Sequence, residues 1–276
     1  MLYICATPIG NLEDITLRVL NTLKEVDYIA CEDTRRTVKL LNHYNITKKL
    51  VSVNEHTEYD KKDAIIKDLE AGMNVALVSD AGMPGIQDPG RLIIEQAIAH
   101  KIPYTVLPGA TAFVTALVGS GLCKDEFLFL GFLPRKKQER ISLLKKYSEF
   151  DREIVVYEAP HRLEKLLDSL WEVFGNRKIV ISRELSKKYE EYIFTDIEEA
   201  IKKHSTLKGE LVIIIERKQE TSEDDYEEED IYRLARQFYA QGLKTKEIAS
   251  RLVDETHISK NKAYEMALDV SNKLTR

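Results

Sequence analysis

The chain has 276 residues, of which 43% are hydrophobic and 32% charged, and its formal net charge is −5 at pH 7. This length predicts about two domains, and the composition is typical of a soluble globular protein. The negative charge argues against a protein that coats nucleic acid by bulk attraction, but it leaves room for a local basic groove. No basic segment precedes an apolar core at the start, and no uncharged apolar run reaches about eighteen residues. We therefore expect neither secretion nor a membrane span, and place the protein in the cytoplasm.

The three cysteines predict neither a disulfide framework nor a metal site. Cys5, Cys31 and Cys123 are far apart in the sequence and lie in apolar surroundings. An odd number at these spacings matches no zinc motif, so we expect buried thiols in a reducing compartment and no bound metal.

Strand-like and helical segments alternate over residues 1–115. Strands are expected at 2–7, 28–31, 50–53, 75–78 and 104–107. One helix is expected to follow residue 14, and Asn11 or Asp14 is suited to cap it. Further helices are expected to run through residue 41 and to span about 61–70 and 92–100. This alternation predicts βαβ units on a parallel sheet, with the loops that follow the five strands at one edge.

The segment after the fourth strand is the first place to look for a ligand. Residues 75–78 are apolar, and a loop with three glycines and two prolines follows before the next helix. Ligands of open parallel sheets sit at the carboxyl ends of the strands, and glycines let the backbone approach them closely. The loop lacks the Lys-Ser or Lys-Thr pair of a nucleotide-triphosphate site, and Asp80 favours a cationic or hydroxyl-bearing ligand. A simple strand-to-helix connection is the alternative.

Residues 116–217 differ in character from the preceding region. Strands are expected at 126–133, 153–158, 178–185, 190–195 and 210–216, with helices at about 138–147, 163–174 and 196–203. Two of the strands are separated by only a few polar residues near Lys187, so they must pair as a hairpin. The region is therefore predicted to be an α+β domain with a mixed sheet.

An acidic linker and a helical extension are expected to complete the chain. Residues 218–230 are strongly acidic. Short helices are expected at 231–239, 244–254 and 259–274, with Gly242 as a helix stop and Ser259 as a cap. The last two resemble a helix-turn-helix in outline, which often occurs without a nucleic-acid function. A helical appendage that helps the protein to dock on its substrate is the interpretation we prefer.

Several short motifs occur in an order that resembles a known family. They are Thr7-Pro8-Ile9-Gly10-Asn11, Glu32-Asp33-Thr34-Arg35, Ser79 to Pro84 with Asp88-Pro89-Gly90, Pro108-Gly109-Ala110-Thr111, Gly131-Phe132-Leu133-Pro134, Tyr157 to Arg162, Arg183-Glu184-Leu185 and Gly209-Glu210. Over about residues 1–217 the chain resembles the bacterial 16S ribosomal RNA (cytidine-2′-O)-methyltransferases of the tetrapyrrole methylase superfamily. Gln87 departs from the pattern, which expects Ser or Asn, and many members shorten or lack the segment after 220.

The resemblance implies a two-domain fold of the tetrapyrrole methylase type: an α/β domain with a parallel sheet (1–115), then an α+β domain (116–217). It implies a homodimer that transfers a methyl group from S-adenosylmethionine to a cytidine 2′-hydroxyl in the decoding region of 16S ribosomal RNA in the small ribosomal subunit. The cofactor is expected between the two domains, in contact with Pro8, Asp80, Gly82, Met83, Thr111, Ala112, Glu158 and Leu211. Asp80 and Thr111 also have structural alternatives, as a cap and as a helix start.

A positioned base would help a ribose hydroxyl to react, since this group is a poor nucleophile at neutral pH. Candidates at the loop edge are Glu32, Asp33 and His56, with Glu184 and His161 as further ones. Each has an ordinary alternative, such as a helix cap or an ion pair, and catalysis by alignment alone stays open.

Positive charge near the loops provides candidate RNA contacts. These residues are Arg35, Arg36, Arg135, Lys136, Lys137, Arg140 and Arg162. Such side chains could follow phosphates, although charged runs are also typical of solvated faces. The target nucleotide is expected to flip into the cleft.

Two other functions are consistent with the sequence. One is a methyltransferase of the same superfamily that acts on a tetrapyrrole or on a protein. The other is a ligand-sensing regulator that binds DNA through its helical extension. Methyl transfer to small ribosomal subunits would separate both from the preferred function.

Overall fold

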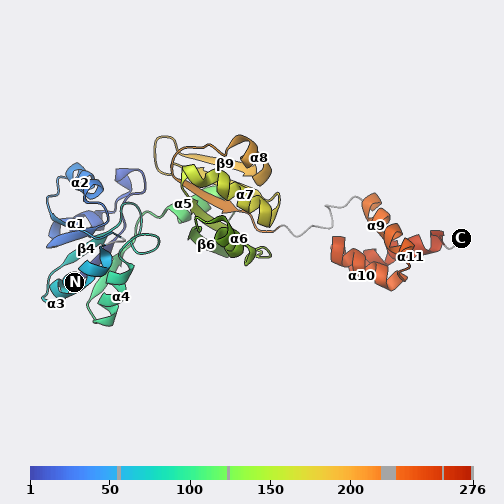
Figure 1. Cartoon of the computed structure of the whole chain (residues 1–276), viewed down its shortest axis with the longest axis horizontal. Coiled ribbons are helices and arrows are strands. Elements are labelled where there is room, and N and C mark those ends of the chain that lie inside the picture. Colours follow the sequence, from blue (N-terminus) through green and yellow to red (C-terminus); the bar gives the residue numbers. More distant parts are fainter. Residues whose placement is uncertain (55–56, 123–124, 219–227, 257, 275–276) are drawn as a thin grey trace. The chain divides into compact units, whose positions relative to one another are not determined.

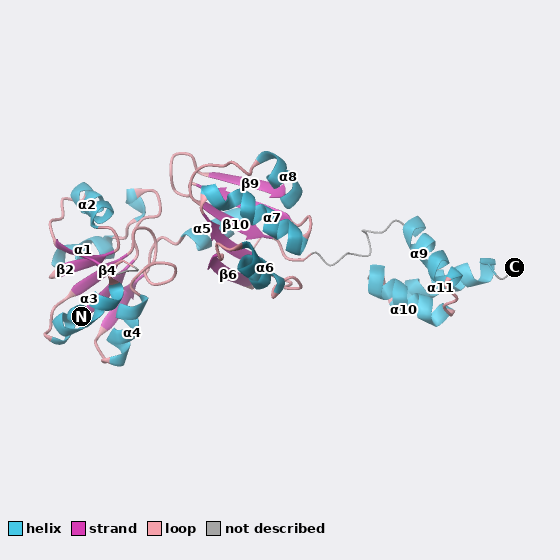
Figure 2. Ribbon diagram, viewed as in Figure 1, coloured by secondary structure: helices cyan, strands magenta, loops and turns pink. Residues whose placement is uncertain are grey.

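The computed structural model describes residues 1–54, 57–122, 125–218, 228–256 and 258–274. The chain forms two compact units, Met1–Arg217 and Lys218–Arg276. The first contains two five-stranded sheets with their helices, and the second is helical (Figures 1 and 2).

The first sheet is parallel throughout, as predicted. Its strand order is β3-β2-β4-β1-β5, and every neighbouring pair is parallel. The strands are β1 (Leu2–Cys5), β2 (Tyr28–Cys31), β3 (Lys49–Ser52), β4 (Val75–Val78) and β5 (Tyr104–Leu107). Because all five strands point the same way, the loops that follow them open at one edge.

Helices cover both faces of this sheet. They are α1 (Leu17–Glu25), α2 (Thr34–His43), α3 (Glu58–Glu70) and α4 (Arg91–Ala99). One apolar cluster joins the sheet to α3 and α4, and another joins it to α1 and α2. Burial on both faces explains why β2 and β4 are apolar along their whole length.

The cap of α1 differs from the sequence prediction. The Thr16 side chain accepts a hydrogen bond from the Val19 N–H, whereas Asn11 caps the short 3-10 helix η1 (Leu12–Asp14) by accepting from the Glu13 N–H. The expectation that Asn11 or Asp14 caps α1 was wrong, because this extra turn delays the start of the helix.

The second sheet is mixed, as predicted. Its order is β6-β7-β10-β8-β9; β6 and β7 are parallel, and the other pairs are antiparallel. Its strands are β6 (Phe127–Phe132), β7 (Glu153–Glu158), β8 (Lys178–Arg183), β9 (Glu191–Asp196) and β10 (Leu211–Ile215). The expected hairpin is confirmed, since β8 and β9 pair from Lys178–Asp196 to Arg183–Glu191. The central position of β10 explains its complete burial.

Helices also cover both faces of the second sheet. They are α5 (Ala112–Ser120), α6 (Lys137–Lys145), α7 (Leu163–Phe174) and α8 (Ile197–Lys203), and the short helix η2 (Pro160–Arg162) precedes α7. One face packs against α6, α7 and α8, and the other against α5. Helix α5 spans the predicted domain boundary at residue 115, and this boundary stays a prediction.

The unit Lys218–Arg276 contains α9 (Glu228–Ala240), α10 (Thr245–Thr256) and α11 (Lys260–Leu274), which share an apolar core. Ser259 accepts from the Lys262 N–H as a cap, and Gly242 follows α9 with a φ of 84°. Of the predicted linker, 219–227 lie outside the described residues and 228–230 belong to α9. No helix among the described residues is long and apolar enough to cross a bilayer.

Candidate functional site

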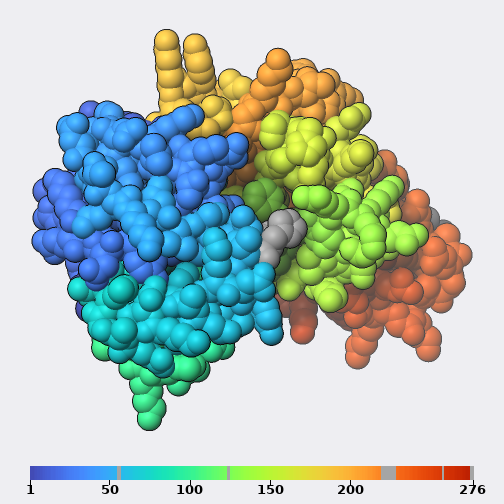
Figure 3. Space-filling view, turned by 60° about the vertical axis from the view of Figure 1, so that its left-hand side comes forward, coloured from blue at the N-terminus to red at the C-terminus, as the bar shows by residue number. Residues whose placement is uncertain are grey.

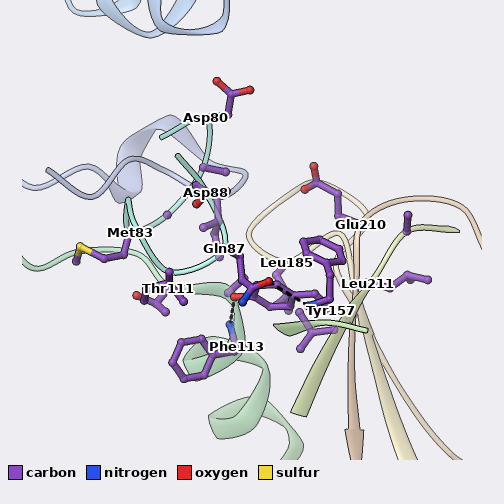
Figure 4. A pocket seen from close by; sticks show the side chains of 18 of the residues that line it. Asp80, Met83, Gln87, Asp88, Thr111, Phe113, Tyr157, Leu185, Glu210 and Leu211 are labelled. Carbon is purple, nitrogen blue, oxygen red and sulfur yellow. Dashed lines mark hydrogen bonds between the residues drawn. The ribbon is translucent and has the colours of Figure 1, made fainter. Parts of the chain in front are cut away.

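A cavity of about 420 Å³ lies between the loop edge of the first sheet and the second sheet. Its walls come from the loops after β1, β2, β4 and β5 on one side and from β6, β7 and β10 on the other. In Figure 3 a hollow separates the blue and cyan surface from the green surface, and Figure 4 shows the lining side chains. This volume is in the range of small-molecule sites.

Most of the predicted cofactor residues line this cavity. Among them are Asp80, Gly82, Met83, Thr111, Ala112, Glu158 and Leu211. Pro8 is not in the lining, but its neighbour Ile9 is. The sequence prediction therefore selected residues from four separated segments that the fold brings together at the cavity.

The loop after β4 is fixed at both ends. At its start, Thr7 and Gly82 exchange backbone hydrogen bonds of 2.9 Å, and Gly82 has a φ of 78°. At its end, Glu58 Oε1 accepts from the Gly90 N–H at 2.9 Å and from the Leu92 N–H at 2.8 Å. The carboxylate of Glu58 thus satisfies free donors at the start of α4.

Three carboxyl groups, those of Glu32, Asp80 and Asp88, line the first-sheet side of the cavity. Asp80 Oδ1 accepts from the Asp33 N–H at 3.0 Å, and Asp80 Oδ2 lies 3.4 Å from Arg36 Nε. The Asp80 N–H in turn donates to Glu32 Oε2 at 3.4 Å. These contacts hold the carboxyl groups of Glu32 and Asp80 beside that of Asp88.

Asp88 is half-buried and has an unusual affinity for a proton. Burial, followed by the charges of Glu32 and Asp80, raises its pKa to about 7, against a hydrogen bond with Ser79 that lowers it. Sequence reasoning missed this residue as a candidate base, although Asp88-Pro89-Gly90 was part of the motif. The sequence contained one indication of this role, since Asp88 lies in the same loop as Asp80.

The environment of Asp33 shifts its pKa in the opposite direction from that of Asp88. Its side chain accepts from the Arg35 backbone N–H at 2.8 Å and from the guanidinium at 3.0 and 2.7 Å. These hydrogen bonds lower its pKa to about 2. Asp33 caps α2 and is absent from the cavity lining, as its structural alternative predicted.

The other candidate bases lie in different settings. Glu32 lines the cavity, and His56 lies outside the described residues. Glu184 accepts from the Glu210 N–H and from the Lys187 ammonium, both at 3.0 Å. His161 is exposed.

Glu158 offers an acceptor to a ligand. Its side chain is 1% exposed, and Oε1 lies 3.0 Å from Arg162 Nε and accepts from the Ala159 N–H at 2.9 Å. Oε2 is buried without a hydrogen-bond partner among the described residues. Burial raises the Glu158 pKa against the effect of these donors. Since an unpaired buried polar atom is costly, a ligand with a hydrogen-bond donor would be favoured here.

The basic candidates fall into two groups. The side chains of Arg35, Arg36, Lys136 and Lys137 are 61–87% exposed, and Arg135 is also exposed. Arg140 is 3% exposed and donates to Ser169 Oγ and to three backbone carbonyls. Arg162 pairs with Glu158 and donates to the Leu133 carbonyl at 2.7 Å. The positions of Arg140 and Arg162 argue against phosphate contacts.

A direct contact joins the two sides of the cavity. Gln87 Oε1, in the loop after β4, accepts from the Phe132 N–H of β6 at 3.2 Å, while Tyr157 Oη accepts from the Phe113 N–H at 3.1 Å and so ties α5 to the second sheet (Figure 4). Gln87 lies against Gly131, where an added Cβ would come within 2.3 Å of the amide. The longer side chain at the position where the family pattern expects Ser or Asn therefore bridges the two sheets.

Comparisons with known proteins agree with this fold. Residues 1–201 match the family Tetrapyrrole (Corrin/Porphyrin) Methylases. The chain is 43% identical over 270 residues to ribosomal RNA small subunit methyltransferase I of Halalkalibacterium halodurans, covering 96% of this chain and 93% of that protein. It is 47% identical over 221 residues to a Hydrogenobaculum sp. protein of the same name, covering 78% of this chain and 95% of that protein.

The fold is also similar to that of a solved structure. The uroporphyrin-III C-methyl transferase from Thermus thermophilus, complexed with S-adenyl homocysteine, aligns with a TM-score of 0.57 at 18% identity. The alignment covers 77% of this chain and 96% of that chain. At this identity the likeness establishes the fold alone.

Proposed function

The chain belongs to the tetrapyrrole methylase family and, within it, to the ribosomal RNA small subunit methyltransferase I family; from this premise we propose that it transfers a methyl group from S-adenosylmethionine to the ribose 2′-hydroxyl of a cytidine in 16S ribosomal RNA. The observation that carries the proposal is the cavity that gathers Asp80, Thr111, Glu158 and Leu211. The proposed substrate implies a cytoplasmic location.

The residues of the cavity fit S-adenosylmethionine. The carboxyl groups of Glu32, Asp80 and Asp88 complement a cation, and apolar side chains such as Met83 and Leu211 suit an uncharged ring. Glu158 Oε2 offers an unused acceptor to an amino or hydroxyl group. S-adenosylmethionine, when bound, supplies a methyl group on a positively charged sulfur.

The protein's own residues have to align the reactants and accept a proton. Methyl transfer to oxygen is an in-line displacement, so alignment supplies much of the catalysis. The contact between Gln87 and Phe132 links the loop after β4 to the second sheet and helps to hold the two sides in place. Described residues include no cluster of three or more His, Cys, Asp or Glu arranged to bind a metal ion.

For the RNA, we propose contacts through the exposed basic residues. Arg36 lines the cavity, and Arg35 lies beside it in the sequence. Arg135, Lys136 and Lys137 begin the segment that leads into α6. Side chains of this kind bind phosphates and position the substrate, while flipping of the cytidine would bring its ribose into the cavity. The small ribosomal subunit is the proposed form of the substrate.

A homodimer is part of the proposal. Leu17 is 80% exposed and Val118 75% exposed, and Tyr104 and Val106 are about half-exposed on β5, the outer strand of the first sheet. A contact surface that covered these side chains in a dimer would remove exposed apolar area from water. A dimer mass in sedimentation, reduced to the monomer mass by Val118→Glu, would support a homodimer, whereas a monomer mass for the unchanged protein would contradict it.

The function is tested by methyl transfer to small ribosomal subunits from cells that lack the modification. We expect label from methyl-labelled S-adenosylmethionine on one cytidine, resistant to alkaline cleavage because its 2′-oxygen is blocked. Subunits that already carry the methyl group are the control. Label on a base carbon, label on a tetrapyrrole, or the absence of transfer would overturn the proposal.

A further inference from the structure

We propose that Asp88 accepts the proton that the ribose hydroxyl loses during methyl transfer. This inference rests on the proposed function and assigns one step of it to a residue. The loop between β4 and α4 presents the Asp88 side chain on the first-sheet side of the cavity, near Asp80 (Figure 4).

Asp88 is anchored from both sides along the chain. The preceding residue, Gln87, is hydrogen-bonded to the Phe132 N–H of the second sheet. Two residues later, the Gly90 N–H donates to Glu58, and Pro89 restricts the backbone between them. A carboxyl group held in this way loses little conformational freedom when it receives a proton from a bound substrate.

Other acidic residues near the cavity are already engaged. Asp33 forms three hydrogen bonds with Arg35, and Asp80 accepts from the Asp33 N–H and faces Arg36. Glu158 pairs with Arg162 through one oxygen. These contacts occupy acceptor positions of the three carboxyl groups, and for Asp33 they also lower the pKa, which weakens it as a base.

The charges around Asp88 give it a proton affinity suited to neutral pH. Two carboxylates face it: Glu32 from the loop after β2 and Asp80 from the end of β4. Arg36 of α2 pairs with Asp80, and Glu58 of α3 accepts from the Gly90 N–H in the same loop as Asp88. The Tyr157 hydroxyl group approaches from β7. Burial and the two carboxylates raise the Asp88 pKa to about 7. A base with a pKa close to the working pH is both available and effective.

In the proposed step, the ribose oxygen forms a bond to the methyl carbon, and the carbon–sulfur bond breaks with its electron pair kept by sulfur. The oxygen–hydrogen bond breaks, and the proton passes to the Asp88 carboxylate, which later releases it to solvent. As the positive charge on sulfur disappears, the carboxyl groups of the cavity lose an attractive partner, so the proton affinity of Asp88 rises during the transfer.

This coupling gives a test that needs no turnover. S-adenosylmethionine carries the positive sulfur and S-adenosylhomocysteine does not, so binding the first should release more protons at pH 7. We expect calorimetry in buffers of different ionisation enthalpy to show this difference for the unchanged protein and to lose it for Asp88→Asn. The same difference in Asp88→Asn would overturn the inference, while failure of both compounds to bind would instead overturn the proposed function.

Single-turnover methylation of small subunits tests the step itself. With cofactor bound, we expect the rate to rise with pH with a midpoint at or below 7, and Asp88→Asn to reduce it about 100-fold and remove the dependence. Asp88→Glu should keep part of the rate and a shifted midpoint. Asp63→Asn, which changes an exposed aspartate on α3, is the matched control. An unchanged rate and midpoint in Asp88→Asn would contradict the role.

Discussion

The two sheets of the first unit supply the same cavity but use their charged residues differently. At the loop edge of the first sheet, Asp80 and Asp88 line the cavity and Arg36 reaches solvent. In the second sheet, Glu153 is 1% exposed and pairs with Arg217 at 2.7 and 2.9 Å, and Arg140 is enclosed by its own region. Glu153, Arg217 and Arg140 thus maintain the fold, whereas Asp80 and Asp88 face the cavity, as does Glu158 of the second sheet.

This difference shows that residue type and position near a loop do not determine a role. Arg135 and Arg140 are five residues apart, yet one is exposed and the other buried. Asp33 and Asp88 lie at the same edge, yet their pKa values are about 2 and about 7. The number of hydrogen-bond partners that each side chain meets inside the protein, acceptors for an arginine and donors for an aspartate, separates the two kinds of residue.

The largest effect is expected from Arg140→Ala. This change removes donors from Ser169 Oγ and from the carbonyls of Pro134, Arg135 and Lys165, so the free energy of unfolding should fall by about 3 kcal/mol. Urea denaturation measures it. Arg135→Ala is the matched control and should change the value by less than about 0.5 kcal/mol. Equal losses in the two variants would contradict the structural role assigned to the buried Arg140.

Asp88→Asn should alter stability in a direction set by pH. The folded-state pKa of about 7 exceeds the ordinary value of 3.8, so the folded protein holds this proton more tightly than the unfolded chain between about pH 4 and 7. The free energy of unfolding therefore falls as pH rises through this window. We expect the Asn variant to be more stable than the unchanged protein by about 2 kcal/mol at pH 8 and equally stable at pH 4.

Asp33→Asn is the comparison for this effect. The lowered pKa of Asp33 stabilises the folded state above the unfolded-state pKa, and this contribution is lost as pH falls through about 2. The variant should therefore be less stable than the unchanged protein at pH 8. Thermal melting of both variants at pH 4 and 8 measures whether each substitution raises or lowers the stability. A change in the same direction for both variants at pH 8 would contradict the environments assigned to the two carboxyl groups.

A smaller effect is expected at the bridge between the sheets. Gln87→Ala removes the acceptor of the Phe132 N–H, which should cost about 1 kcal/mol of unfolding free energy. Gln138→Ala, at an exposed position of α6, is the control. Chemical denaturation followed by circular dichroism measures the difference. No loss relative to the control would show that the bridge contributes nothing.

The smallest change in stability is expected for Arg36→Gln. The side chain is 61% exposed and lies 3.4 Å from Asp80, so the unfolding free energy should change by less than about 0.5 kcal/mol. If Arg36 contacts a phosphate, the slope of log RNA affinity against log salt concentration should decrease in magnitude by about one in this variant. Lys39→Gln, on the same helix, is the control. An unchanged slope would exclude Arg36 from the RNA surface.

Much of the fold could be predicted because local pattern and tertiary structure agree. Residues 75–78 form an apolar run between turn residues, and β4 has the predicted bounds. Boundaries were less accurate where a long-range contact decides them. Helix α3 begins at Glu58 rather than near Lys61, at a residue whose carboxylate accepts from Gly90 and Leu92 of a distant segment.

The candidate site was predicted in its location but not in its chemistry. The place of Asp80 and Thr111 follows from parallel strands whose loops share an edge. The high proton affinity of Asp88 depends on burial and on two carboxylates that precede it by 56 and 8 residues in the sequence. The burial of Arg140 likewise depends on Ser169 and Lys165, which no local pattern connects to it.

The place of β10 has a consequence for how the protein is made. It is the last strand of its sheet to leave the ribosome, yet it pairs with β7 and β8 at the centre. A nascent chain that ends before Leu211 can complete the parallel sheet, while β7 and β8 still lack the strand between them. Closure of the cavity is therefore delayed until translation has passed Ile215, and until then two strand edges need protection from aggregation.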